Sequence, residues 1–183
     1  MMRPCLSPLG RFRRFRRRTA GGVATIEFVL MFLPMFVLAV SGFEMGLLMT
    51  RQVMMERGMD LTVREVRLNT GADYTETDLR KSICKGAGII EDCLSKVRLE
   101  MLRIDPDNWT DPPAQPSCAN LSEPFKPARN FQNGNQNELM LLRACGKFEP
   151  MLSDFALGWT LSRMYDDAHY RLYATSAFVM EPR

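Results

Sequence analysis

A single acidic residue, Glu27, lies near the start of a long apolar run in this 183-residue chain. An unpaired carboxylate in the hydrocarbon of a membrane costs several kcal/mol, so such residues usually have a partner. A buried charge that is paired is tolerated and can fix the register between packed elements. The chemistry that Glu27 offers is therefore the binding of a cationic group beside an apolar helix.

The other reactive residue types form no catalytic or metal-binding pattern. The chain has one histidine, His169, and it contains no glycine-rich phosphate loop, no Ser/His/Asp arrangement and no Cys-x-x-Cys pair. Structural zinc sites generally use closely spaced Cys and His ligands. We therefore expect no enzymatic activity, no cofactor and no metal.

The four cysteines that follow the apolar run predict a disulfide-bonded region. They are Cys84, Cys93, Cys118 and Cys145. In an oxidising compartment an even number of cysteines favours two disulfides, and three pairings are possible here. We favour Cys84–Cys93, which flank one short segment, together with Cys118–Cys145, which would close a stretch rich in Pro and Asn.

The positive charge of the chain is concentrated in residues 1–22. This leader contains seven arginines and no Asp, Glu or Lys, whereas the whole chain has a net charge of only +3, so residues 23–183 are net negative. The distribution argues against nucleic-acid binding. Arginines beside an apolar helix follow the positive-inside rule, which puts the N-terminus in the cytoplasm and the residues beyond Arg51 across the membrane.

Residues 23–50 are predicted to form a transmembrane helix. The uncharged stretch from Phe28 to Phe43 covers about 24 Å as a helix, and its apolar flanks extend it to the roughly 30 Å of a bilayer core. Glu27 and Glu44 would then lie near opposite membrane interfaces. A cleaved secretory signal is the alternative, but the run is too long and no small-x-small cleavage site follows it.

Helical periodicity continues through residues 51–71. Met55, Met59, Val63 and Val66 form one apolar stripe, and Gly71 is a suitable C-terminal stop. Gly58 weakens the prediction of an unbroken helix.

Residues 72–183 are predicted to form a small α+β domain. Capping residues begin a short helix from Glu76 to Cys84, and "SKVRLEMLRID", "ELMLLRACGKFEP" and "YRLYATSAFVME" are expected strands. Residues 106–137 form a long excursion with a turn at Asn133-Gly134. Between the last two strands, "MLSDFALGWTLSRM" is either an amphipathic helix or an ordered loop, and we expect Trp109 and Trp159 to be buried. The fold class is α+β, with a long N-terminal helix packed on a small antiparallel sheet.

The start of the apolar run resembles a type IV prepilin. In "GGVATIEFVLMFLPMF" a glycine directly precedes the helix and a glutamate is its fifth residue. The resemblance implies that prepilin peptidase cuts after Gly22 and makes Val23 the new N-terminus. Glu27 would then pair with the α-amino group of a neighbouring subunit, because a desolvated charge is tolerable when paired.

Further motifs resemble the TadE family of pseudopilins from the tight-adherence (Tad, or Flp) pilus system. They are Glu27-Phe28, Leu33-Pro34, "SGFEMG" around Glu44, and the closing "YRLYATSAFVMEP", whereas Val23 stands where the family often has Ala. The resemblance implies a pilin-like fold and a minor pseudopilin that supports pilus assembly and adherence, with Glu27, Phe28 and Glu44 as assembly residues.

The same resemblance implies a location and a set of partners. The protein would be a single-pass protein of the bacterial inner membrane with a periplasmic C-terminal domain. Its partners would be prepilin peptidase, a TadF-like pseudopilin, the major Flp pilin and the inner-membrane platform. Two other interpretations stay open. One is a type II secretion pseudopilin, whose leader follows nearly the same sequence pattern, and the other is a signal-anchored periplasmic binding module.

Overall fold

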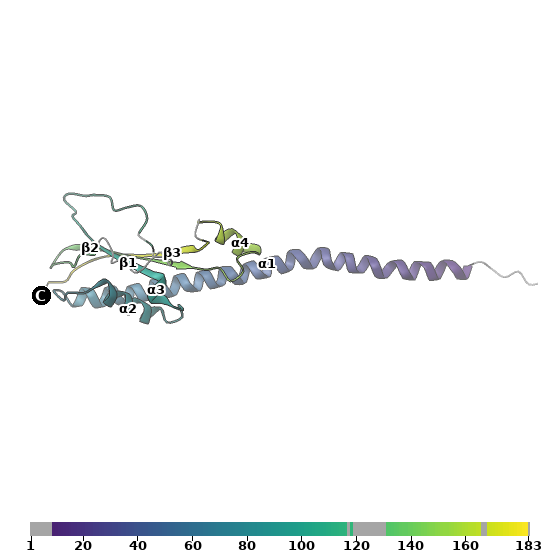
Figure 1. The fold of residues 1–183 in the computed structure, drawn as a ribbon, viewed down its shortest axis with the longest axis horizontal. Coiled ribbons are helices and arrows are strands. Elements are labelled where there is room, and N and C mark those ends of the chain that lie inside the picture. The colour runs from purple at the N-terminus through teal and green to yellow at the C-terminus, as the bar shows by residue number, and fades with distance from the viewer. Residues whose placement is uncertain (1–8, 117, 119–130, 166–167, 183) are drawn as a thin grey trace, which may run out of the picture. The chain divides into compact units, whose positions relative to one another are not determined.

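The computed structural model of the chain describes residues 9–116, 118, 131–165 and 168–182, with side chains described from residue 23 onward. The elements follow the order α1 (Leu9–Leu68), α2 (Glu76–Ala87), α3 (Cys93–Lys96), β1 (Val97–Ile104), β2 (Leu139–Phe148), α4 (Ala156–Ser162) and β3 (Tyr170–Val179) (Figure 1). The chain divides into two compact units, Met1–Gly42 and Phe43–Arg183. Each unit is described by itself below.

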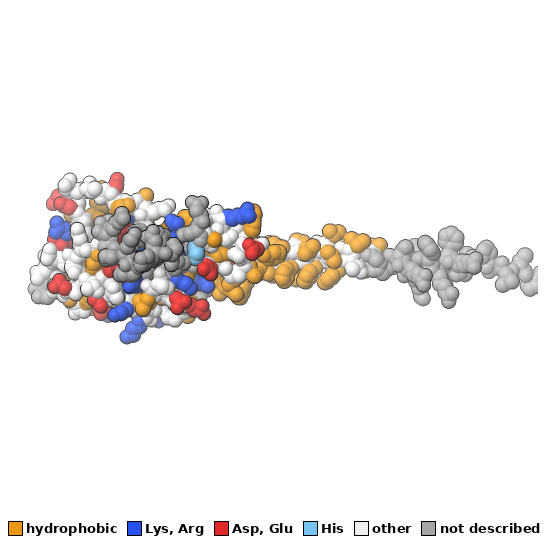
Figure 2. All heavy atoms as spheres, viewed as in Figure 1, with side chains coloured by type: hydrophobic (Ala, Val, Ile, Leu, Met, Phe, Trp, Pro, Cys, Tyr) orange, Lys and Arg blue, Asp and Glu red, His pale blue; other side chains and the backbone are white. Residues whose placement is uncertain are grey.

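The first unit consists of the N-terminal part of α1. Its side chains from Val23 to Gly42 are almost all apolar and mostly exposed (Figure 2), and Pro34 lies within the helix without ending it. By length and composition, the stretch of α1 from Val23 to Leu68 includes a segment able to cross a membrane, and that segment is not buried within the structure. Residues 1–8 of the arginine-rich leader lie outside the described residues.

The second unit is built on a three-stranded antiparallel sheet with the order β1-β2-β3. Val97 pairs with Gly146, and Gly146 pairs with Leu172 on the other side of β2. Because side chains alternate between the faces of a strand, one face carries the apolar residues Leu99, Leu142 and Ala174, all of which are buried. The three predicted strands are confirmed.

The C-terminal part of α1 packs on this apolar face. Its stripe of Met55, Met59, Val63 and Val66 is buried and belongs to the same hydrophobic cluster as the sheet residues. Gln52 adds a polar contact, because its side-chain nitrogen donates to the carbonyl oxygen of Tyr173 in β3 at 2.9 Å. The predicted stripe and the α+β class, with the helix laid on a small sheet, are therefore confirmed.

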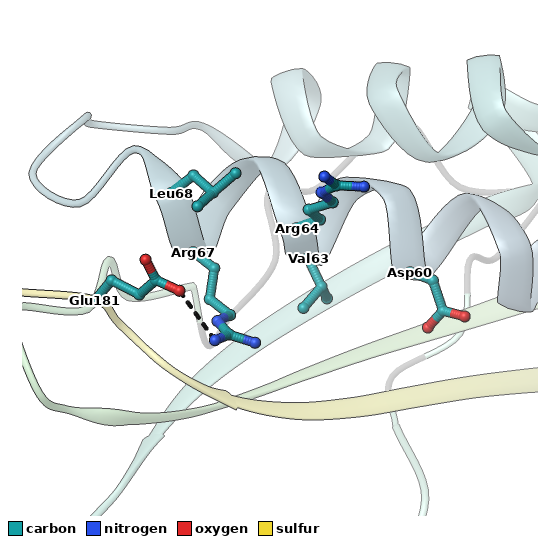
Figure 3. A pocket seen from close by; sticks show the side chains of 6 residues that line it. All are labelled: Asp60, Val63, Arg64, Arg67, Leu68 and Glu181. Atoms are coloured by element: carbon teal, nitrogen blue, oxygen red, sulfur yellow. Dashed lines mark hydrogen bonds and ion pairs between the residues drawn. The ribbon is translucent and has the colours of Figure 1, made fainter.

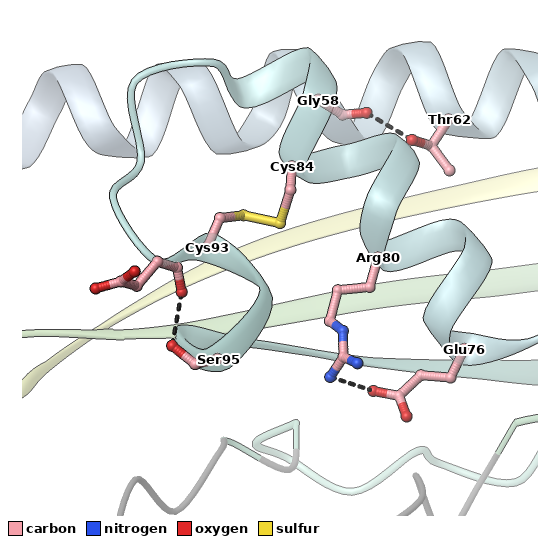
Figure 4. Close-up of a disulfide and its surroundings, with 8 residues drawn as sticks. Gly58, Thr62, Glu76, Arg80, Cys84, Cys93 and Ser95 are labelled. Atoms are coloured by element: carbon pink, nitrogen blue, oxygen red, sulfur yellow. Dashed lines mark hydrogen bonds and ion pairs between the residues drawn. A yellow bond between two sulfur atoms is a disulfide. The ribbon is translucent and has the colours of Figure 1, made fainter. Parts of the chain in front are cut away.

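Gly58 marks the place where α2 crosses α1 (Figure 4). A Cβ atom added to Gly58 would lie 2.4 Å from the carbonyl oxygen of Ile83, and one added to Gly86 would lie 2.8 Å from the Cα of Gly58. The helix is continuous here, and Thr62 donates to the Gly58 carbonyl at 2.9 Å. The glycine that weakened the helix prediction is thus explained by the close approach of two helices.

The two disulfides are Cys84–Cys93 and Cys118–Cys145, the pairs that the sequence favoured. The first joins α2 to α3, as Figure 4 shows. The second joins the excursion after β1 to the middle of the sheet, since Cys145 lies in β2. The first bond therefore links two helices, and the second ties a segment of irregular structure to a strand.

Several local predictions differ from the structure. The helix expected at Glu76 to Cys84 extends to Ala87, and the ambiguous segment after β2 forms the short helix α4. The turn predicted at Asn133-Gly134 is wrong: it lies at Gln136-Asn137, where Asn137 adopts a φ of 61°. Trp109 and Trp159, expected to be buried, are 60% and 46% exposed. Each is in or next to an irregular segment, where apolar character alone does not ensure burial.

Candidate assembly site on the apolar helix

The predicted processing and pairing residues lie within one turn of α1. Gly22 belongs to α1, but its surroundings lie outside the described side chains. Val23 and Glu27 are both exposed. Residues four apart on a helix are neighbours on one face, so a cut after Gly22 would create an amino group on the same face as the Glu27 carboxylate.

Glu27 has no hydrogen bond or ion pair with any residue in the described part of the chain. Its neighbour Phe28 is 63% exposed and begins a row of stacked rings, with Phe32 at 5.3 Å and Phe36 a further 5.7 Å along, measured between ring centroids. This row forms an aromatic ridge on one side of the helix. The first unit therefore offers a single carboxylate beside a large apolar surface.

Glu44, the second predicted assembly residue, has a different environment. It lies in the second unit and is only 2% exposed. Both of its carboxylate oxygens lie 3.2 Å from the backbone nitrogen of Met151, which donates to them. Glu44 is therefore enclosed by its own domain, because the loop after β2 folds over it.

Arg51 continues this connection between α1 and the sheet. Its guanidinium donates to the Tyr170 hydroxyl and to the Glu149 carbonyl, the latter at 3.4 Å, and lies 5.5 Å from the centre of the Phe148 ring. Burial raises the pKa of Tyr170, the hydrogen bond and charge of Arg51 oppose that rise, and the charge of Glu44 adds to it. Tyr170 therefore stays neutral and serves as a hydrogen-bonding partner.

This Arg51–Tyr170 pair was not identified from the sequence. The available signal was the position of Arg51 as the first basic residue after the apolar run. The paired tyrosine at the start of β3 could not be recognised without the register of the sheet.

The chain's closing segment is fixed to the other end of α1. Arg67 forms an ion pair with Glu181 at 2.9 Å (Figure 3), and the Thr70 hydroxyl donates to the Glu181 carbonyl at 2.7 Å. Arg67 and Glu181 border a surface hollow of about 420 Å³ that Asp60, Arg64 and Leu68 also line. The acidic residue of the closing Glu-Pro pair therefore has a local structural partner.

The opposite face of the sheet carries buried ion pairs. Arg143 lies 2.7 Å from Glu100 and donates to the Pro113 carbonyl at 2.6 Å, with both charged side chains about 7% exposed. Removing one partner of such a pair is strongly destabilising, because it leaves an uncompensated buried charge. Together with the Cys118–Cys145 bond, this pair holds the excursion after β1 against the sheet.

The described residues contain no group of three or more His, Cys, Asp or Glu side chains arranged to hold a metal ion. His169 lies 3.2 Å from a carboxylate oxygen of Glu149. Comparison with protein-family models, with curated proteins and with solved structures finds no match to this chain.

Proposed function

We propose that this protein is a minor pseudopilin of the Tad type that supports pilus assembly and surface adherence. The observation that carries the proposal is Glu27, an exposed carboxylate with no partner among the described residues, one helical turn beyond Val23. It lies on an exposed apolar helix, and the resemblance to TadE covers the same residues. A lone carboxylate there needs a cationic partner from another chain.

Maturation would supply the cationic group. Hydrolysis of the Gly22–Val23 peptide bond by prepilin peptidase would release the leader and leave an α-amino group on Val23. In an assembled group of helices, the amine of one subunit would face Glu27 of the next. Pairing would remove the cost of the buried carboxylate and set the axial register between the helices, while Phe28 and its ring neighbours would pack in the interface.

The proposed topology is a single-pass protein of the bacterial inner membrane. The arginines of residues 1–22 would keep the N-terminus in the cytoplasm. The second unit would then be periplasmic, a compartment in which disulfides form and persist. The proposed partners are a TadF-like pseudopilin, the major Flp pilin and the inner-membrane platform.

Glu44 takes an indirect part in this scheme. Its buried contacts with the Met151 backbone favour a role in holding the loop after β2 against α1. It would support assembly by fixing the domain to the helix that Glu27 aligns.

The deciding experiment is the intact mass and N-terminal sequence of the protein recovered from host membranes. We expect a chain that begins at Val23. Gly22→Ala should leave the full-length precursor, because the added methyl occupies the cleavage position, whereas the matched control Gly21→Ala should mature normally. A wild-type chain that keeps its leader would favour the signal-anchored binding module, and a cut near Thr50 would indicate a secreted domain.

The pairing role of Glu27 is tested by co-purification. Glu27→Ala should insert into the membrane but lose most of its association with pilus components, while Glu27→Asp, which keeps the charge on a shorter side chain, should retain more. Unchanged co-purification of Glu27→Ala would contradict the role. Recovery of type II secretion components in place of Tad components would favour that system.

A further inference from the structure

The second unit carries an exposed apolar surface at the end where its part of α1 begins. Its residues, termed the α4 surface, are Phe43, Met45, Met151, Leu152, Phe155 and Trp159, each at least 40% exposed. They come from the start of this unit and from the segment that contains α4. Figure 1 places α4 at the end of the domain far from the C-terminus, and Figure 2 shows hydrophobic side chains there.

Two connections make the α4 surface an ordered feature. The Met151 backbone donates to Glu44, which joins the loop to α1 next to Phe43. Leu152 packs so closely on α4 that a Cβ added to Gly158 would lie 2.0 Å from its carbonyl oxygen. The apolar side chains are thus displayed on a folded segment.

The level of this surface in a membrane follows from the length of the preceding helix. Val23 to Gly42 spans about 30 Å at 1.5 Å per residue, which equals the thickness of a bilayer core. Phe43 and Glu44 then reach the headgroup region on the side of the domain. Met151 is hydrogen-bonded to Glu44, so it lies beside the residues that directly follow this apolar segment.

We propose that the α4 surface lies in the headgroup and upper acyl region of the phospholipid leaflet that faces the domain. This inference rests on the membrane-spanning role of α1 proposed above. Trp159 and Arg163 support it, because the guanidinium carbon lies 4.2 Å from the centre of the indole ring, and Trp is enriched at membrane interfaces while long basic side chains there extend to the headgroups. Interfacial segments bury their apolar face about 5–10 Å deep.

The surface would restrict the orientation of the domain relative to the bilayer. A domain joined to the membrane only through one helix can tilt, whereas a second membrane contact beside the helix would limit the tilt of the domain. Lipid is favoured over a second copy of the chain because Phe43, the first residue of the α4 surface, directly follows the apolar segment Val23–Gly42 in the sequence. A membrane that surrounds this segment would therefore also reach the α4 surface.

The chain's two tryptophans supply a matched test. Trp159 lies in the α4 surface. Trp109 instead follows the end of β1, and the last residue of β1, Ile104, lies at the opposite end of the sheet. The full chain would be reconstituted into phosphatidylcholine vesicles containing lipids brominated near the top of the acyl chains. Trp109→Phe leaves Trp159 as the reporter, and Trp159→Phe leaves Trp109.

We expect the brominated lipid to quench roughly half or more of the Trp159 emission and little of the Trp109 emission, as burial at the interface requires. Equal quenching of the two reporters would overturn the proposal. Protection of Trp159 from aqueous iodide that rises with protein density, without quenching by lipid, would also overturn it and indicate a second copy. Resistance to alkaline carbonate extraction tests the span separately, so loss of the span and loss of the lipid contact are distinguishable.

Discussion

The crossing of α2 over α1 at Gly58 gives a prediction with a calculable magnitude. Alanine is the better helix former, and replacing an exposed helical glycine by alanine gains up to about 1 kcal/mol. At Gly58 the new methyl would lie 2.4 Å from the Ile83 carbonyl oxygen and 3.1 Å from the Ala87 nitrogen. Relieving the first contact requires a shift of roughly 1 Å toward ordinary van der Waals distance.

The shift cannot be confined to one side chain, because both close atoms belong to the backbone of α2. That helix is held by its buried residues Leu79 and Ile83 and by the Cys84–Cys93 bond. Overpacking a core costs about 1–3 kcal/mol and sometimes more. After subtracting the gain in helix propensity, we expect Gly58→Ala to lower the free energy of unfolding by up to about 2 kcal/mol.

The assay is urea unfolding of the second unit in the full chain, held in detergent micelles with its disulfides intact and followed by tryptophan fluorescence. Gly46→Ala is the matched control, because it makes the same change in the same helix at a position where an added Cβ meets no atom within 4 Å. The control should be as stable as the wild type or slightly more stable. Equal stability of Gly58→Ala and Gly46→Ala would refute the close approach of the helices.

Two further predictions concern carboxylates in the second unit. Glu44→Ala should lower the free energy of unfolding by about 1–3 kcal/mol, because it leaves the Met151 N–H without its acceptor. Glu44→Gln should lower it less, since the amide oxygen of glutamine still accepts a hydrogen bond. Wild-type stability of Glu44→Ala in the same urea assay would contradict the contact. Hydrogen bonds from the Thr75 hydroxyl and backbone lower the pKa of Asp78 below its ordinary value of 3.8. The contribution of the ionised Asp78 carboxylate to the free energy of unfolding is therefore complete above pH 3.8, and it is lost as the pH falls through the folded-state pKa. The free energy of unfolding of Asp78→Asn should vary less with pH in the acid range than that of the wild type. Identical pH profiles of the two proteins would contradict this prediction.

The sequence predicts best where a pattern is local. The stripe of Met55, Met59, Val63 and Val66 needs only helical periodicity, and the alternation in β3 needs only the period of a strand. The disulfide pairing follows from proximity along the chain for Cys84–Cys93. These features are read within one element or one short segment, so tertiary structure did not alter them.

Predictions for positions that contact distant segments were less accurate. Helix propensity alone counts Gly58 against a continuous helix, whereas the structure requires a glycine there because Ile83 and Gly86 of α2 approach it closely. The turn was assigned to Asn133-Gly134 by its dipeptide, but Gly134 lies so close to Met140 and Met180 that an added Cβ would approach their side chains within 3.0 Å. The glycine therefore allows close packing, and Asn137 provides the left-handed residue of the turn.

The two acids of the apolar helix illustrate why residue type alone did not separate their roles. Glu27 and Glu44 each follow a glycine-containing motif, and the sequence suggests assembly for both. Glu44 already accepts the Met151 N–H within its own chain, so a neighbouring amine would gain little by replacing it. Glu27 has no such partner among the described residues, so in the proposed assembly it would have the larger electrostatic gain from a neighbouring subunit. We therefore expect loss of Glu27 to impair association and loss of Glu44 to impair first the fold of the domain.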